Sequence, residues 1–144
     1  MIRCADINDL YAAAELAALL WRGSTTEELA DEFRPLLATG GARIFLQYEG
    51  GVPIGFAQCQ LRHDYVEGTD TSPVGYLEGI FVREGYRRRG YGRALLSACE
   101  SWARAQGCQE FASDCEIDNA GSFRFHQAAG FAEANRVICF TKRL

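Results

Sequence analysis

The 144-residue sequence lacks the basic excess that a dedicated nucleic-acid-binding protein usually carries. Its 19 acidic side chains outnumber the 15 lysines and arginines, and the formal net charge at pH 7 is -4. No apolar run is long enough to span a bilayer, and the opening MIRCADINDL carries acids rather than the basic and apolar stretches of a secretory signal. We therefore expect a cytoplasmic protein with neither a nucleic acid nor a membrane as its partner.

Closely spaced cysteines are also missing, although the chain contains six. A zinc site needs ligands at short spacings, and the sequence has no C-x-x-C pair. Segments such as FAQCQ and VICF place cysteine among apolar residues, where it acts as a small hydrophobic core residue. We expect reduced, buried thiols and no metal site.

The hydrophobic pattern predicts one α/β domain over residues 1–144, with nearly half of the residues apolar. Its elements follow the order βααβββαβαβ around a central sheet. The expected strands are residues 1–5, 42–49, 54–62, 74–83, 108–115 and 131–144. The expected helices are residues 6–20, 24–38, 92–107 and 119–130, with Ser24 or Thr25 at the start of the second.

A strongly basic loop, VREGYRRRGYGRALL, joins the long fourth strand to the third helix. Glycines at 90 and 92 let the backbone approach an anion, and the first N–H groups of the helix point at the same place. The loop contains neither G-x-x-x-x-G-K-[ST] nor G-x-G-x-x-G, which excludes two common nucleotide-binding loops. From the residues alone, a phosphate cradle, a nucleic-acid patch and a solvated turn all stay open.

The segment RRRGYG matches the R/Q-x-x-G-x-G/A motif of the GCN5-related N-acetyltransferases, and DNAGSFRFHQAAGF resembles that family's later helix. The resemblance implies a mixed, mostly antiparallel sheet with helices on both faces, and acetyl-CoA as co-substrate. It places the pyrophosphate on the basic loop and the pantetheine along the fourth strand, with Asn119 touching the pantetheine from the other side. The implied cofactor-binding residues are Ile80, Phe81, Val82, Arg88, Arg89, Gly90, Tyr91, Gly92, Arg93 and Asn119.

The longer segment RHDYVEGTDTSPVGYLEGIFV is similar to the aminoglycoside 6′-N-acetyltransferases of Gram-negative bacteria, which confer antibiotic resistance and form homodimers. A polycationic substrate suits the acids of this chain, whose combined field would attract it. These acids are Asp64, Glu67, Asp70, Glu78, Asp114 and Glu133. The resemblance further implies that the substrate is lined by Trp21, Ser24, Tyr65, Glu78, Asp114 and Asn135.

Glu78 is the strongest catalytic candidate, because an acid inside an apolar strand is costly unless it is paired or solvated. By resemblance it faces the reacting amine and acts as general base, and the alternative is a place on the wet face of the strand. Relatives often have a tyrosine proton donor where His126 stands, and this imidazole can donate instead or serve only as a helix residue. Trp21 fits the core equally well, while Ser24 and Asp114 also suit cap or turn positions.

The predicted activity is acetyl transfer from acetyl-CoA to the 6′-amine of an aminoglycoside, by direct attack of the amine on the thioester. A polyamine or a protein N-terminus is the alternative substrate within the same enzyme class. A non-catalytic acyl-CoA-binding module is the alternative outside it. A hydrolase is not supported, since His63 has no serine or cysteine nucleophile motif nearby.

Overall fold

Five strands form one sheet in the computed structural model, which describes all residues 1–144. The strand order is β1-β2-β3-β4-β5, with every neighbouring pair antiparallel except the parallel β4 and β5. The strands are β1 (Ile2–Cys4), β2 (Ala42–Glu49), β3 (Val52–Arg62), β4 (Val74–Val82) and β5 (Phe111–Ser113). The helices are η1 (Ile7–Asp9), α1 (Leu10–Leu20), α2 (Thr26–Ala38), η2 (Glu84–Tyr86), α3 (Tyr91–Ala105) and α4 (Ala120–Ala128).

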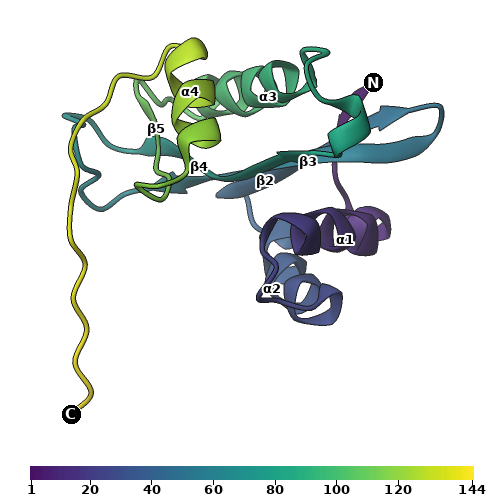
Figure 1. The fold of residues 1–144 in the computed structure, drawn as a ribbon, viewed down its shortest axis with the longest axis horizontal. Coiled ribbons are helices and arrows are strands. Elements are labelled where there is room, and N and C mark those ends of the chain that lie inside the picture. The colour runs from purple at the N-terminus through teal and green to yellow at the C-terminus, as the bar shows by residue number, and fades with distance from the viewer.

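Helices cover both faces of this sheet, as expected: α1 and α2 lie on one face, and α3 and α4 lie on the other (Figure 1). The α1 side is filled by Leu16, Phe33 and Phe56, which are at most 1% exposed. The α3 side is filled by a second cluster around Leu95 and Cys99. Each helix therefore buries one apolar stripe against the sheet, which leaves the ends of the strands for function.

The 3₁₀ turn η1 and the helix α2 begin at side-chain caps that the sequence encodes. Asp6 accepts a hydrogen bond from the Asn8 amide and forms a capping box at η1, so the expected helix from residue 6 begins as a 3₁₀ turn. Thr25 caps α2, accepting from the Glu28 amide while Glu28 accepts from the Thr25 amide. The cap is therefore Thr25, which leaves the neighbouring Ser24 free for another role.

A β-bulge interrupts β4 at Glu78. Leu77 is paired with Cys59 and Gly79 with Gln58, so Glu78 is the extra residue on its strand. Simple alternation would direct Gly79 toward α3, but a Cβ at this glycine would lie 2.5 Å from the ring of Trp21 on the α1 side. The bulge therefore turns two successive residues toward α1 and α2, which no period-two pattern predicts.

Strand β5 is much shorter than the expected 108–115. It pairs with β4 only at Gly75, Tyr76 and Leu77, and the pairing ends where the bulge begins. Beyond that point β4 continues for five residues with β3 on one side and no strand on the other. The two parallel strands thus separate into a V that opens beside Glu78.

The expected last strand, residues 131–144, does not form. After Phe131 the chain passes the 63–73 loop, where Asn135 donates a hydrogen bond to Glu67, and then leaves the body of the domain (Figure 1). A strand needs a neighbour for its backbone hydrogen bonds, and this segment has no strand of its own chain beside it. The segment has the alternating apolar residues of a strand, but a single chain offers it no neighbouring strand to pair with.

Half of the cysteines do not follow the expectation of buried thiols. Cys59, Cys99 and Cys108 are buried, whereas Cys4, Cys115 and Cys139 are exposed. Cys139 is exposed because its segment is not packed in the sheet. No helix of the protein is both long enough and apolar enough to cross a membrane.

Candidate active site

A hollow of about 480 Å³ lies between the start of α2 and the bulge of β4. Glu78 lines it together with Trp21 and Ser24, which the resemblance had assigned to the substrate. Buried Gln58 and exposed Glu32 complete its polar lining. The fold thus gathers two carboxylates, an indole and an amide from four different elements or loops into one concave surface.

Trp21 serves both the core and the wall of this hollow. Its ring packs edge-on against Phe33 and Phe56, with centroid distances of 6.4 and 5.8 Å. The same ring lies over Gly79 and contributes to the hollow. One edge of the indole is therefore packed in the core, and the rest of the ring forms part of the wall of the hollow.

Glu78 is held in place by the guanidinium of Arg62. Arg62 Nη2 lies 2.8 Å from Oε1 and 3.1 Å from Oε2, and the carboxylate side chain is only 21% exposed. The guanidinium also stacks on Tyr76, 3.4 Å from the ring centroid. Stacking and bidentate pairing fix the carboxylate in one orientation in a partly dry setting.

Asp114 belongs to the same network through Tyr76, whose hydroxyl donates to the Asp114 carboxylate. Burial, followed by this hydrogen bond, raises the pKa of Tyr76 well above its usual value, so the phenol stays protonated as a donor. Glu78 and Asp114 are thus the two ends of one chain of contacts through Arg62 and Tyr76. The structure brings both predicted acids to the apex of the V, Glu78 on β4 and Asp114 directly after β5.

The basic loop ends in a tight turn at the start of α3. Gly90 is the N-cap residue with φ +83°, and Arg88 has φ +62°. The first hydrogen bond of the helix runs from the Ala94 amide to the Gly90 carbonyl, so the amides of residues 91–93 have no intrahelical partner. A backbone in this conformation presents several N–H groups to one point, as an anion-binding turn requires.

The arginines of this loop divide between holding the turn and facing solvent. Arg87 Nε donates to the Val82 carbonyl at 2.8 Å, and Arg89 pairs with Glu49 at 3.7 Å. Arg88 and Arg93 are exposed without an ion pair. Their charges are therefore available to an incoming anion.

Residues Ile80, Phe81 and Val82 form the part of β4 that has β3 on one side only. The backbone groups on their other side face the V between β4 and β5. This is the geometry in which an extended amide chain can add to a strand edge. The three residues lie between the Gly90 turn and Glu78.

His126 lies on α4 with its ring directed at the end of β5. Nε2 is 2.8 Å from Ser113 Oγ, and Nδ1 is 2.7 Å from the Ser122 carbonyl oxygen. Asn119 accepts from the Ser122 amide at 3.1 Å and so caps α4. His126 thus contacts its own helix through Nδ1 and the end of β5 through Nε2.

Other predicted residues are not brought to the hollow. Tyr65 is 77% exposed in the 63–73 loop, and Asn135 is tied to Glu67 instead. Glu133 pairs with Arg136, and this pair lowers the pKa of Glu133. These residues belong to the 63–73 loop and to the segment after Phe131, and neither segment lines the hollow in the single chain.

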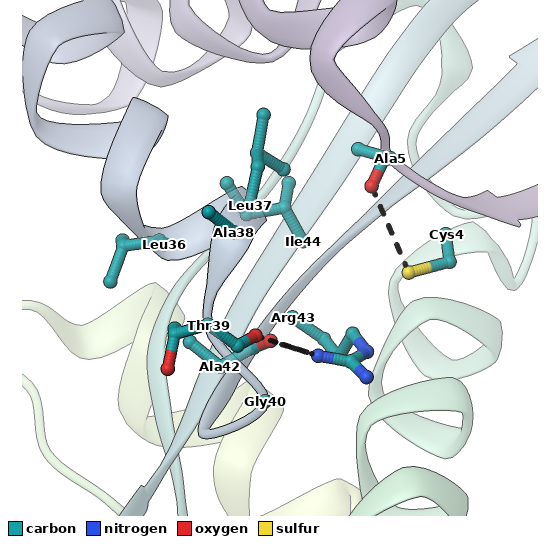
Figure 2. A pocket seen from close by; sticks show the side chains of 10 residues that line it. All are labelled: Cys4, Ala5, Leu36, Leu37, Ala38, Thr39, Gly40, Ala42, Arg43 and Ile44. Atoms are coloured by element: carbon teal, nitrogen blue, oxygen red, sulfur yellow. Dashed lines mark hydrogen bonds between the residues drawn. The ribbon is translucent and has the colours of Figure 1, made fainter.

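A second hollow, of about 410 Å³, lies at the C-terminal end of α2, beside the start of β2 (Figure 2). Its wall is mainly aliphatic, with Leu36, Leu37 and Ile44 beside the turn at Gly40. The guanidinium of Arg43 is used by the carbonyl oxygens of Thr39 and Ala42, and no carboxylate or imidazole faces the space. This hollow therefore lacks acid–base groups and is not an active-site candidate.

Sequence reasoning missed four residues of the site: Arg62, Tyr76, Glu32 and Ser113. Arg62 and Glu78 are 16 positions apart, and only the antiparallel pairing of β3 with β4 brings them together. Glu32 lies on the exposed side of α2, where a carboxylate is ordinary. No group of three or more His, Cys, Asp or Glu side chains is arranged to hold a metal ion.

The chain belongs to the acetyltransferase (GNAT) family, whose model matches residues 10–131. It is 40% identical over 145 aligned residues to an aminoglycoside N(6')-acetyltransferase type 1 of Serratia marcescens, covering 100% of this chain and 99% of that one. It is 42% identical over 124 residues to the enzyme of the same name in Salmonella typhimurium, covering 86% of each chain.

Solved structures give the same result. The structure of AAC(6')-Iy with the bisubstrate analogue CoA-S-monomethyl-acetylneamine superposes with a TM-score of 0.95 at 39% identity, covering 100% of this chain and 98% of that chain. The 6'-N-acetyltransferase AAC(6')-Ih of Acinetobacter baumannii gives a TM-score of 0.93 at 38% identity, with the same coverage. The family prediction is confirmed by both comparisons.

Proposed function

We propose that the protein transfers the acetyl group of acetyl-CoA to the 6′-amine of an aminoglycoside and so confers resistance to it. The observation that carries this proposal is the acidic, Trp21-walled hollow at the point where β4 and β5 separate. Relatives that match nearly the whole chain at about 40% identity bear this activity in their names. The protein thus combines membership of a family that uses acetyl-CoA with a pocket whose acidic lining suits a polycation.

Acetyl-CoA binds in the V between β4 and β5, with its pyrophosphate at the amides of residues 91–93 and its pantetheine along Ile80–Val82. The Gly90 turn and the unpaired side of β4 support this placement. Arg88 and Arg93 add positive charge at the phosphate end. The thioester then lies at the apex of the V, next to Glu78 on one side and Ser113 on the other.

Glu78 accepts the proton that the 6′-ammonium group must lose before the nitrogen attacks the thioester carbon. Its carboxylate is already aimed by Arg62, so little reorganisation is needed when the amine arrives. A main-chain N–H near Ile80 or Phe81 stabilises the oxyanion that develops on the carbonyl oxygen. Asp114, Glu32 and Trp21 bind the remaining ammonium groups and sugar face, and His126 supplies the proton that the departing sulfur needs.

The test is a substrate panel with the purified protein: kanamycin, tobramycin and an analogue with a hydroxyl in place of the 6′-amine. We expect turnover of acetyl-CoA with the first two and none with the hydroxyl analogue, which fixes the regiochemistry. Turnover with spermidine or peptides but not with kanamycin would replace the substrate while keeping the chemistry. No turnover with any amine, together with tight coenzyme A binding, would favour an acyl-CoA-binding module.

The working form is proposed to be a homodimer, because residues 137–144 expose a row of apolar side chains that a monomer leaves in water. Val137, Ile138 and Phe140 are 69, 81 and 88% exposed. The outer edge of β5 has no strand partner. A second copy can supply that partner by strand addition, which buries the apolar row and brings residues near Asn135 toward a neighbouring site.

The site of action is proposed to be the cytoplasm, where acetyl-CoA is produced. Six cysteines without a disulfide suit a reducing compartment. Neither a nucleic acid nor a membrane is part of the proposed mechanism.

A further inference from the structure

The pair formed by His126 and Ser113 has a defined proton arrangement. A carbonyl oxygen can only accept a hydrogen bond, so the 2.7 Å contact with Ser122 O places a proton on Nδ1 of the imidazole. In the neutral ring Nε2 is then an acceptor, and the Ser113 hydroxyl donates to it across 2.8 Å. When the ring is protonated, Nε2–H donates to Ser113 Oγ, and the hydroxyl proton is released for another acceptor.

Ser113 stands at the last paired position of β5, opposite Leu77 and one residue before the Glu78 bulge. Its Oγ is 3.4 Å from the Leu77 carbonyl oxygen, so the hydroxyl lies between the two strands at the apex of the V. The rings of Phe125 and Phe131 flank His126 at centroid distances of 5.8 and 5.1 Å. The imidazole is therefore packed behind the serine, and its Nε2 is directed at that hydroxyl.

We propose that Ser113 is the residue that hands the proton to the sulfur of coenzyme A, with His126 as the reservoir behind it. When the tetrahedral adduct collapses, the C–S bond breaks and the sulfur takes the bonding electron pair. The Ser113 hydroxyl proton moves to that sulfur while the Nε2 proton of the imidazolium moves to Ser113 Oγ. The products are free thiol, intact serine and neutral imidazole, which solvent reprotonates. This inference rests on the proposed acetyl transfer and names a step within it.

The geometry favours this relay over direct donation by the imidazole. Nε2 faces the Ser113 hydroxyl and Nδ1 faces a backbone carbonyl, so neither nitrogen presents a free N–H to the V. A hydroxyl that both donates and accepts can transfer a proton in one concerted step. The Ser113 hydroxyl also places the proton transfer to sulfur on the β5 side of the thioester, away from Glu78. The base and the acid thus act from opposite strands.

The test compares Ser113→Ala with Ser113→Thr, which keeps the hydroxyl, and with Ser101→Ala, whose serine is exposed on α3. With whichever amine the wild type accepts, we expect Ser113→Ala to lower kcat about 100-fold, the lower end for acid–base catalysis. The KM for acetyl-CoA should stay within about twofold, because a step made only after binding is affected. Ser113→Thr should recover most of kcat, and Ser101→Ala should match the wild type.

A double variant separates the relay from a purely structural role. His126→Gln should lose a similar factor, and the double variant should lose no more than either single one. Additive losses, or Ser113→Ala with kcat within about twofold of wild type, would overturn the relay even with acetyl transfer intact.

Mass spectrometry of the wild type after incubation with acetyl-CoA alone provides a further check. The relay leaves Ser113 unmodified, so an unchanged mass is expected. An acetyl group on Ser113 would show that the neutral imidazole activates the hydroxyl as a nucleophile, and it would overturn the proposal. Absence of wild-type turnover with every amine contradicts the proposed function instead, so the two failures are distinguishable.

Discussion

At the scale of single residues, the site works by holding charges in prepared positions. Glu78 accepts hydrogen bonds from Nε and Nη2 of Arg62, and Asp114 accepts one from the Tyr76 hydroxyl. The hollow therefore presents the Glu78 carboxylate in an orientation that is already set. The cost of aligning it is carried by folding rather than by the reaction.

Replacing Glu78 by glutamine tests the role of its charge with little change in shape. The amide cannot accept the ammonium proton, so we expect kcat to fall about 10²- to 10⁴-fold. Calorimetric affinity for coenzyme A should be unchanged, because the cradle lies at the other end of the V. Glu15→Gln, at an exposed and unpaired position of α1, is the matched control. Retained turnover in Glu78→Gln would place the base elsewhere.

Asp9 should make stability depend on pH. Burial by itself would raise its pKa, but hydrogen bonds from the Asp6 amide, Arg3 and Tyr48 outweigh this and hold it below the usual value. A depressed folded pKa adds stability that is present above the unfolded value of about 4 and is lost as the pH falls through the folded value.

Asp9→Asn should therefore lower the free energy of unfolding at pH 7 by about 1–3 kcal/mol. Denaturant titrations at neutral pH and near pH 3 should show the difference from wild type shrinking in acid. Asp31→Asn, on the exposed side of α2, is the control and should change little at either pH. An equal deficit at both pH values would mean that packing, and not charge, is responsible.

At the scale of elements, the β4 bulge connects the sheet to the site. It turns Gly79 toward Trp21, and the ring of Trp21 occupies the space that a Cβ would need. It also ends the pairing with β5 and so opens the V. One extra residue in β4 therefore orients Glu78, makes room for the Trp21 ring over Gly79 and leaves the end of β4 without a strand on one side.

Gly79→Ala should disturb this arrangement specifically. The added methyl group meets Trp21 at 2.5 Å, so the indole must move, at a cost of about 1–3 kcal/mol in unfolding free energy. Because Trp21 lines the hollow, we expect the KM for the amine to rise more than the KM for acetyl-CoA. Gly40→Ala, where a Cβ meets nothing within 4 Å, should be neutral in both assays. An unchanged amine KM would remove Trp21 from the binding wall.

At the scale of the whole molecule, two features lack a partner within the chain. Residues 137–144 are extended and expose apolar side chains, and β5 is an edge strand of the sheet. Phe140→Asp tests whether a second copy joins these two features. Since Phe140 is 88% exposed in the single chain, the change should leave a monomer unaffected. A dimer that buries this ring should dissociate at least about 10-fold more readily, as measured by sedimentation, because a buried phenylalanine contributes about 1.5–3 kcal/mol.

Thr141→Asp, at the next position, adds the same charge without removing an apolar side chain and serves as the control. It should weaken association less than Phe140→Asp does. Identical sedimentation of both variants and the wild type as monomers would contradict the proposed dimer. Loss of activity together with dimerisation in Phe140→Asp would show that the neighbouring copy completes the site.

Much of this architecture could be predicted from the sequence because its signals are local. Caps, turns and apolar periods indicated the helices, and the resemblance to a known family assigned the Arg-Gly loop to a cofactor and the acid within β4 to a base. Arg62, Tyr76 and Ser113 could not be found this way, because their importance comes from strand pairing and from the helix that faces them. The segment after Phe131 was expected as a strand because its pattern is correct, but a pattern does not supply a pairing partner.

The resemblance to a known family supplied the layering with helices on both faces, whereas the sequence by itself determined the order of elements, the helix start at Asp6 and the glycine turn at Gly90. These follow from short-range rules of capping, periodicity and backbone freedom, which act within a few residues. Only the tertiary structure decided that Glu78 and Gly79 turn to the same face, that Arg62 pairs with Glu78 and that His126 lies behind Ser113. Each of these depends on register and packing between segments far apart in the chain, which no local signal encodes.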